Sequence, residues 1–197
     1  MKMFAHQLLK AAKILGFCLI FFGILYPAAV WGCSNLFFSK QAGGSFENTA
    51  EGRMSLLAGQ NIEKDENLWG RRQNGQIIQN TDGTYSLMAI PADHNTGSEE
   101  YIQETERYKL EIERRNPEAK GKVPEELYTW SASGMDPDIS LDAALYQIPR
   151  IARARNVSEE TIEQLIESAA ENPLPGSDSG KRVNIVKVNL ALNDLGR

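Results

Sequence analysis

The stretch SASGMDPDISLDAALYQIPRIARAR, residues 131–155, carries the most specific local signals for folded structure in this chain. Gly134 allows the backbone to turn where a Cβ would interfere. Asp136 precedes Pro137 and is therefore biased toward an extended conformation, from which its carboxylate can accept nearby backbone N–H groups. The first part of the stretch thus predicts a tight turn that is supported by its own side chains.

A helix is expected to follow this turn, with Ser140 as its N-cap. Pro149 lacks an N–H and would clash with the preceding helical turn, so the helix must kink there or restart with the proline in its first turn. Arg150 and Arg153 fall on one side, three residues apart. The buried stripe of this helix is predicted to consist of Leu141, Leu145, Ile148, Ile151 and Ala152.

Two interpretations of these arginines are open. Either they are solvated or pair with Asp136, Asp138 or Asp142 on a well-capped scaffold, or the turn and the arginine-bearing helix form a docking surface for a partner. A catalytic role is disfavoured, because no base accompanies the serines and no activated nucleophile is indicated. His94 could serve a hydrolase, but a single loop histidine is more often polar surface.

Upstream of this stretch, the pattern predicts a hairpin and a helix. Residues 75–92 alternate around an Asp82-Gly83 pair, which is typical of a tight turn between two strands. Residues 98–117 predict a solvated helix that is capped by Ser98 or Thr96 and ends at Pro117.

Downstream, residues 157–173 predict a second amphipathic helix with Ser158 as its N-cap. Residues 182–192, RVNIVKVNLAL, are rich in β-branched side chains and predict a strand. Helices and strands mix without a regular βαβ repeat, so the predicted class is α+β.

The N-terminal part of the chain has a different composition. Residues 14–39 contain no charged side chain, and as a helix they would extend roughly 39 Å, more than the ~30 Å hydrocarbon core of a bilayer. The membrane anchor is expected to include Ile14, Phe21, Phe22, Tyr26, Pro27 and Trp31. The chain is therefore expected to carry one transmembrane helix.

Charge asymmetry gives the expected orientation. Lys2, Lys10 and Lys13 precede the apolar run, which places the N-terminus in the cytoplasm by the positive-inside rule. The expected organisation is a cytoplasmic N-terminus, a transmembrane helix, a polar tether and an extracytoplasmic α+β domain, at residues 1–13, 14–38, 39–55 and 56–197.

A cleaved signal peptide is the alternative to an anchor. VWGC at residues 30–33 is similar to a lipoprotein cleavage box, which would make the protein a surface lipoprotein. Trp31 is bulky where that box requires a small residue, and the apolar run resumes at Leu36. The anchor is therefore favoured.

Composition excludes several functions. The net charge is −5, and because the first 33 residues hold three lysines and no acid, the remainder carries about −8. A domain of that charge is a poor candidate for nucleic-acid binding, for which a basic face is typical. The two cysteines, Cys18 and Cys33, are too far apart along a helix for a disulfide, and with two histidines in the chain no Cys/His zinc site is indicated.

Several motifs resemble the C subunit of the Kdp-type high-affinity potassium-transporting ATPase. LYPAAVWG resembles the membrane helix of that family, SLLAGQ and LWGR are similar to two of its short motifs, and the stretch at 131–155 is the most specific match. RVNIVKVNLAL resembles its C-terminal signature. Asp138 stands where the family usually has His, and residues 74–120 match poorly.

The resemblance implies a non-catalytic subunit of an ATP-driven potassium importer in the cell membrane. Its partners would be a channel-like potassium-translocating subunit, a P-type ATPase subunit and a small single-helix subunit. The complex as a whole would use potassium and ATP, and this chain is expected to bind no cofactor of its own. It would support assembly and ATP use, docked at the outer potassium entrance. The family-motif and interface candidates are Gln60, Gly70, Arg71, Ser133, Gly134, Asp136, Pro137, Ser140, Gln147, Arg150 and Arg153.

Overall fold

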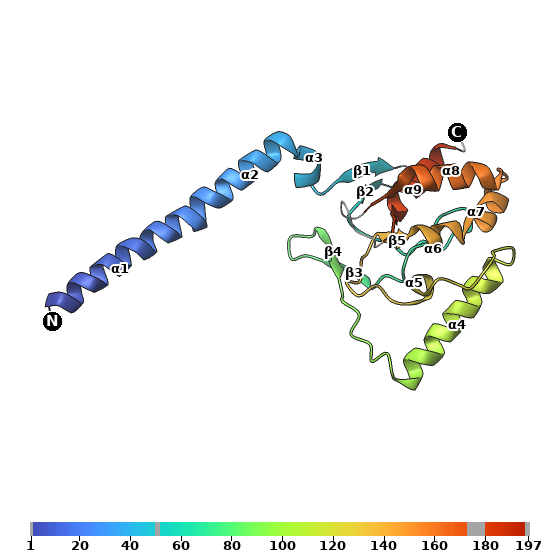
Figure 1. Cartoon of the computed structure of the whole chain (residues 1–197), viewed down its shortest axis with the longest axis horizontal. Helices are drawn as coiled ribbons and strands as arrows, with labels where there is room; N and C mark the ends of the chain where they lie inside the picture. Colours follow the sequence, from blue (N-terminus) through green and yellow to red (C-terminus); the bar gives the residue numbers. More distant parts are fainter. Residues whose placement is uncertain (1, 50–51, 173–179, 196–197) are drawn as a thin grey trace. The chain divides into compact units, whose positions relative to one another are not determined.

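The structure is a computed structural model of the 197-residue chain, and it describes residues 2–49, 52–172 and 180–195. The chain divides into two compact units, Met1–Phe46 and Glu47–Arg197 (Figure 1).

The first unit is a long apolar helix followed by a short one. Its helical segments are α1 (Lys2–Ile20), a π-helical turn (Phe21–Leu25), α2 (Tyr26–Phe37) and α3 (Ser39–Ala42). The helix Met3–Phe37 contains an 18-residue window that is long and apolar enough to cross a membrane. This confirms the prediction of one long apolar helix near the N-terminus.

The π-helical turn has a local cause in the sequence. Pro27 carries no N–H, and the preceding Tyr26 N–H bonds to the carbonyl of Phe21, five residues back, in place of the usual four. The helix continues through this π-helical turn into α2, because the proline falls in the first turn of α2. Cys18 and Cys33 are both free thiols, as their separation predicts.

The segment expected to be a tether contains regular structure, because α3 lies at its start and two short strands follow. β1 (Phe46–Thr49) and β2 (Gly52–Ser55) form a two-stranded sheet. The predicted hairpin is also present, as β3 (Gly75–Gln79) and β4 (Tyr85–Ala89) in antiparallel register with Ile77 opposite Leu87. Gly83 turns between them with a φ of +83°.

Helix α4 (Glu99–Arg115) confirms the predicted helix at 98–117. The Ser98 hydroxyl accepts a hydrogen bond from the Tyr101 N–H, so Ser98 and not Thr96 is the N-cap. Only Ile112 of this helix is buried, and the rest of its surface is half-buried or exposed, as its charged sequence predicts.

The stretch at residues 131–155 folds as its turn, N-cap and proline signals predict. A single turn, α5 (Glu125–Tyr128), precedes β5 (Asp138–Ser140), which leads directly into α6 (Leu141–Leu145) and α7 (Ile148–Arg155). The helix ends at Leu145 and restarts with Pro149 in the first turn of α7. Ser140 caps α6 by accepting a hydrogen bond from the Ala143 N–H.

The buried face of these two helices differs in part from the predicted stripe. Ile148, Ile151 and Ala152 are buried as expected, whereas Leu141 and Leu145 are half-buried. The buried positions in α6 are instead Ala143 and Ala144, because the restart at Pro149 changes the helical phase between the two segments.

The strand prediction for residues 182–192 is wrong. Only β7 (Arg182–Asn184) is extended, and α9 (Ile185–Asp194) follows it. Asn184 caps this helix by accepting a hydrogen bond from the Lys187 N–H. The buried positions Ile185, Val186, Val188, Asn189 and Leu192 line one helical face, so core burial outweighs the small helix penalty of β-branched residues.

One small sheet and four helices build the core of the domain. β7 lies between β5 and β6 (Ala170–Glu171) in antiparallel register, with buried Ile139 opposite buried Val183. α8 (Glu159–Ala169), capped by Ser158 as predicted, packs with α6, α7 and α9 around this sheet. The domain is α+β, which confirms the predicted class.

Candidate functional site

Arg150, the arginine of the most specific motif, is completely buried. Its guanidinium donates to the Asn116 Oδ1 at 3.0 Å, the Gln147 Oε1 at 2.7 Å, and the backbone carbonyls of Asn67, at 3.0 Å, and Asp65. Burial lowers the pKa of Arg150 to about 9, with Asp65 partly opposing the shift. The group is still charged at neutral pH, and its charge is met by oxygen atoms from three segments of the chain.

Two buried amides clamp the segment Leu68–Trp69. The Gln147 side chain accepts from the Trp69 N–H at 2.9 Å and donates to its carbonyl at 3.0 Å. The Asn189 side chain makes the same pair of bonds to Leu68, at 2.7 and 2.9 Å. Because Gln147 also donates to the Ala143 carbonyl and accepts from Arg150, all of its hydrogen-bonding capacity is used.

The Trp69 ring and the neighbouring glycine complete this buried cluster. The Arg150 and Arg115 guanidiniums lie 3.6 and 4.3 Å from the ring centroid, in cation–π geometry. A Cβ on Gly70 would lie 2.6 Å from the Ile185 side chain, so only glycine fits there without displacement. Leu68, Trp69 and Gly70 of the motif LWGR are therefore packing residues.

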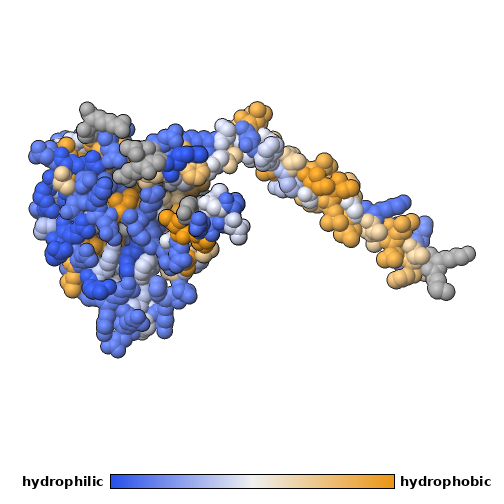
Figure 2. Space-filling view, turned by 180° about the vertical axis from the view of Figure 1, so that it is seen from behind, coloured by the Kyte–Doolittle hydropathy of each residue, from blue (hydrophilic) through white to orange (hydrophobic). Residues whose placement is uncertain are grey.

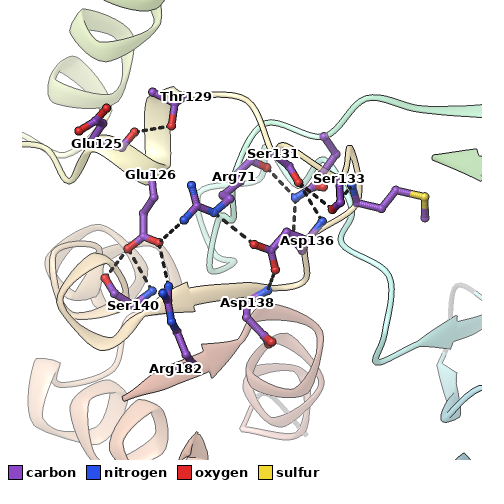
Figure 3. A network of polar contacts seen from close by, with 12 residues as sticks. Arg71, Glu125, Glu126, Thr129, Ser131, Ser133, Asp136, Asp138, Ser140 and Arg182 are labelled. Carbon is purple, nitrogen blue, oxygen red and sulfur yellow. Dashed lines mark hydrogen bonds and ion pairs between the residues drawn. The ribbon is translucent and has the colours of Figure 1, made fainter. Parts of the chain in front are cut away.

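A second network, at the surface, centres on Glu126 (Figure 3). Its carboxylate, 11% exposed, pairs with Arg71 at 3.1 Å and with Arg182 at 3.6 Å, and accepts from both the N–H and the hydroxyl of Ser140. Arg71 also lies 3.3 Å from the Asp136 carboxylate. A cavity of about 380 Å³ borders this network, but both of its arginines are already paired with acids.

The carboxylates of the motif support the turn and the strand that follows. Asp136 Oδ1 accepts from the Asp138 N–H at 3.0 Å, as predicted from the sequence. Asp138 accepts from the Asn184 amide at 3.1 Å, which joins β5 to β7. Burial raises the pKa of Asp138, and its hydrogen bond to Asn184 partly opposes that shift.

The turn at 131–135 holds the base of the β3–β4 hairpin. The Gly134 carbonyl accepts from the Asn74 N–H at 2.8 Å, and the Asn74 carbonyl accepts from the Ile90 N–H at 2.9 Å. Gly134 has a φ of +79°, and a Cβ there would lie 2.2 Å from the Ile90 carbonyl oxygen. Gly134 is therefore required twice, by its own conformation and by the close approach of the hairpin base.

The remaining candidates have separate environments. Pro137 accepts a hydrogen bond from the Ile185 N–H through its carbonyl, and the Ser133 hydroxyl lies 3.3 Å from that of Ser131. Gln60 is half-buried and lines a groove of about 430 Å³. Arg153 is exposed and pairs with Glu118.

These positions narrow the roles that Gln147 and Arg150 can have. Gln147 and Arg150 are fully buried, so neither can touch a partner directly, and any role in docking is limited to supporting the fold. None of the described arginine contacts in α7 uses Asp136, Asp138 or Asp142. Arg150 is neither solvated nor salt-bridged to a neighbouring acid, but bound by carbonyl and amide oxygens.

His94 lies at the surface beside aromatic rings. Its ring centroid is 5.4 Å from that of Trp130 and 5.8 Å from that of Tyr101. These contacts account for its position, so the hydrolase interpretation gains no support within the described residues. Nor do those residues contain a cluster of three His, Cys, Asp or Glu side chains that could hold a metal ion.

Comparison with known proteins identifies the family. The family model described as KdpC, K+-transporting ATPase, c chain, matches residues 8–194. The chain belongs to the KdpC family. The potassium-transporting ATPase KdpC subunits of Serratia proteamaculans (strain 568) and Methylobacterium nodulans are 35% and 34% identical to it. The matches cover 88% and 96% of this chain and 90% and 98% of those relatives.

The KdpC match confirms the resemblance seen in the motifs. A third relative, the KdpC subunit of Rhodopseudomonas palustris (strain TIE-1), is 36% identical over 87% of this chain and 88% of its own length. The matched region includes both the apolar helix and the domain. Cys33, the residue of the lipoprotein alternative, lies inside α2, which continues to Phe37.

Sequence reasoning missed most partners of the motif residues in this KdpC chain. Glu126 is the second acid of an ordinary Glu-Glu pair, and nothing nearby distinguishes it from Glu125. Asn116 is a helix-terminal asparagine, and its bond to Arg150 joins residues 34 positions apart. Only Asn189 could have been recognised from the sequence, because an amide side chain within the apolar run VNLAL is expected to have a specific buried hydrogen-bond partner.

Proposed function

We propose that this chain is a non-catalytic accessory subunit of an ATP-driven potassium import complex in the cell membrane. The observation that carries the proposal is the KdpC match over residues 8–194, which spans both units. The KdpC relatives are named as subunits of potassium-transporting ATPases, and they are matched over 88–98% of their length.

In this function the chain contributes structure to the complex, while its partners carry the chemistry. Those partners are a channel-like subunit that moves potassium, a P-type ATPase subunit that hydrolyses ATP and a small single-helix subunit. The buried Arg150 cluster and the Glu126 network support this assignment, because their charged groups are engaged within the domain. No potassium or ATP chemistry is assigned to the residues of this chain.

The apolar helix is the membrane anchor, with the N-terminus in the cytoplasm and the domain outside. Lys2, Lys10 and Lys13 before the apolar run support that orientation. On the outer side the domain docks at the potassium entrance of the channel-like subunit. Assembly then brings the ATPase subunit into its working complex, so the effect of this chain on ATP use is indirect.

The test is co-purification of the full chain from membranes. A tag on this chain is expected to recover a channel-like membrane protein and a P-type ATPase in constant proportion, and deletion of the chain is expected to abolish potassium-dependent ATP hydrolysis by the remainder. Recovery of the chain alone from membranes that contain the other subunits would overturn the proposal.

A further inference from the structure

The β3–β4 hairpin exposes apolar side chains that the domain does not cover. All five residues of β3 are exposed, and Ile77, at 76%, is opposite Leu87, at 53%. Among the described residues of the domain, the large exposed hydrophobics are Leu57, Ile77, Ile78, Leu87, Met88, Ile102, Leu110 and Leu195. Half of them lie in this one hairpin, and the face of the domain that Figure 2 shows is mostly hydrophilic.

Both faces of the hairpin carry such residues. Register places Ile77 and Leu87 on one face and Ile78 and Met88 on the other. A two-stranded hairpin is marginal in water by itself, and in the described part of the chain no third strand pairs with it. Neither strand contains a lysine or proline that would protect an edge from pairing.

The base of the hairpin, in contrast, is held firmly. Asn74 is bonded to Gly134 and Ile90, and the Gln73 amide donates to the Asp136 carbonyl at 2.8 Å. The Ser131 N–H donates to the Arg72 carbonyl at 2.8 Å. The family motif therefore fixes the direction in which an otherwise uncovered hairpin projects.

The charges of the hairpin argue against a lipid surface as its partner. Residues 75–92 contain no lysine or arginine, which a surface that binds anionic lipids would carry. The single charge is Asp82, at the turn, and hydrogen bonds from the Thr84 hydroxyl and N–H lower its pKa. Insertion of the tip into a bilayer would bury this ionised carboxylate, whereas the apolar residues lie along the two strands.

We propose that the β3–β4 hairpin is the docking element of the domain, and that its sides bind an uncharged, apolar extracytoplasmic surface of another subunit of the complex. The partner covers Ile77 and Leu87, which form the more exposed of the two faces, and the free strand edges are available for backbone hydrogen bonds to it. This inference rests on the proposed function, because it requires a multisubunit assembly.

The test is site-specific photo-crosslinking in the assembled complex. A photo-reactive amino acid replaces Ile77 in the full-length chain, and the matched control carries it at Ile102, which is 56% exposed on α4. Position 77 is expected to crosslink to another subunit, identified by mass, and position 102 is not. Crosslinks from position 77 to lipid, to a second copy of this chain or to nothing would overturn the inference.

A charge substitution gives a second readout. Ile77→Lys is expected to lower the recovery of partner subunits about tenfold or more, because the ammonium would be buried against an apolar surface, while Ile102→Lys leaves it unchanged. Equal recovery with both variants would contradict docking through the hairpin. If the wild-type chain recovers no partner, both the proposed function and the hairpin inference fail. If the wild-type chain recovers its partners but position 77 gives no crosslink to a subunit, only the hairpin inference fails.

Discussion

Arg150 and Ile77 occupy environments opposite to those that their side chains suggest. The guanidinium is fully buried among oxygen atoms and the Trp69 ring, whereas the isoleucine is 76% exposed on a hairpin. Arg150 of the family motif therefore works inside the domain, whereas the rest of the domain leaves Ile77 of the neighbouring hairpin uncovered. Substitutions in the two regions should separate folding from assembly.

The largest expected effect is at Arg150. Arg150→Ala leaves the Asn116 and Gln147 side-chain oxygens and the carbonyls of Asp65 and Asn67 without a donor, and should lower the free energy of unfolding by about 3–5 kcal/mol. Denaturant unfolding of the purified full-length chain measures this.

Arg153→Ala is the matched control on the same helix. Arg153 and its partner Glu118 are both about half exposed, so the expected loss is about 0–1 kcal/mol. Similar losses at the two positions would show that burial of Arg150 is not what makes it important.

Gly134 should show the next largest effect. Gly134→Ala adds a Cβ 2.2 Å from the Ile90 carbonyl oxygen at a residue with positive φ, and should cost about 2–3 kcal/mol while it displaces the base of the hairpin. Gly83→Ala is the control, because Gly83 also has positive φ but open space around its Cα, and should cost about 1 kcal/mol. Thermal unfolding of both variants decides whether the close approach matters.

Asp138 provides a smaller effect that depends on pH. Because burial raises its pKa above 3.8 in the folded state, the folded chain binds the proton more tightly, and stability falls as pH rises through the interval from 3.8 to the folded pKa. Asp138→Asn keeps an oxygen acceptor for Asn184 and removes the charge. Its Tm should exceed that of the wild type by about 2 °C at pH 7 and by almost nothing at pH 3. A difference that is the same at both pH values would rule out the titration of Asp138 as the cause.

The smallest expected effect on stability is at the hairpin. Ile77 is exposed in the chain, so Ile77→Lys should change the free energy of unfolding by no more than about 0.5 kcal/mol. The same denaturant experiment as for Arg150 checks it. A large loss of stability would mean that Ile77 belongs to the core of the domain, and the hairpin would no longer be a candidate contact surface.

Local signals predicted the elements whose formation is decided locally. The Ser98, Ser140 and Ser158 caps, the Asp82-Gly83 turn and the restart at Pro149 all involve contacts within a few residues, and each is found in the structure. The α+β class follows from the same signals.

Prediction was wrong or incomplete where distant residues decide the outcome. The run at 185–192 is helical, and not a strand, because its buried face packs against the sheet and α8, which its β-branched composition does not indicate. The environment of Arg150 depends on Asp65 and Asn67, more than 80 positions away in sequence. The exposure of Ile77 could not be predicted either, since an alternating strand pattern normally implies one covered face.

One measurement tests the separation of scaffold from contact surface most directly: the amount of partner subunit recovered per folded chain, compared for Ile77→Lys and Arg150→Ala in the same membranes. Resistance of the domain to protease gives the folded fraction. The expected result is that Ile77→Lys keeps a protease-resistant domain and loses its partners, whereas Arg150→Ala loses the resistant domain, and the chains that remain folded still bind. Full recovery with Ile77→Lys, or loss of partners by a stably folded Arg150→Ala, would contradict the account.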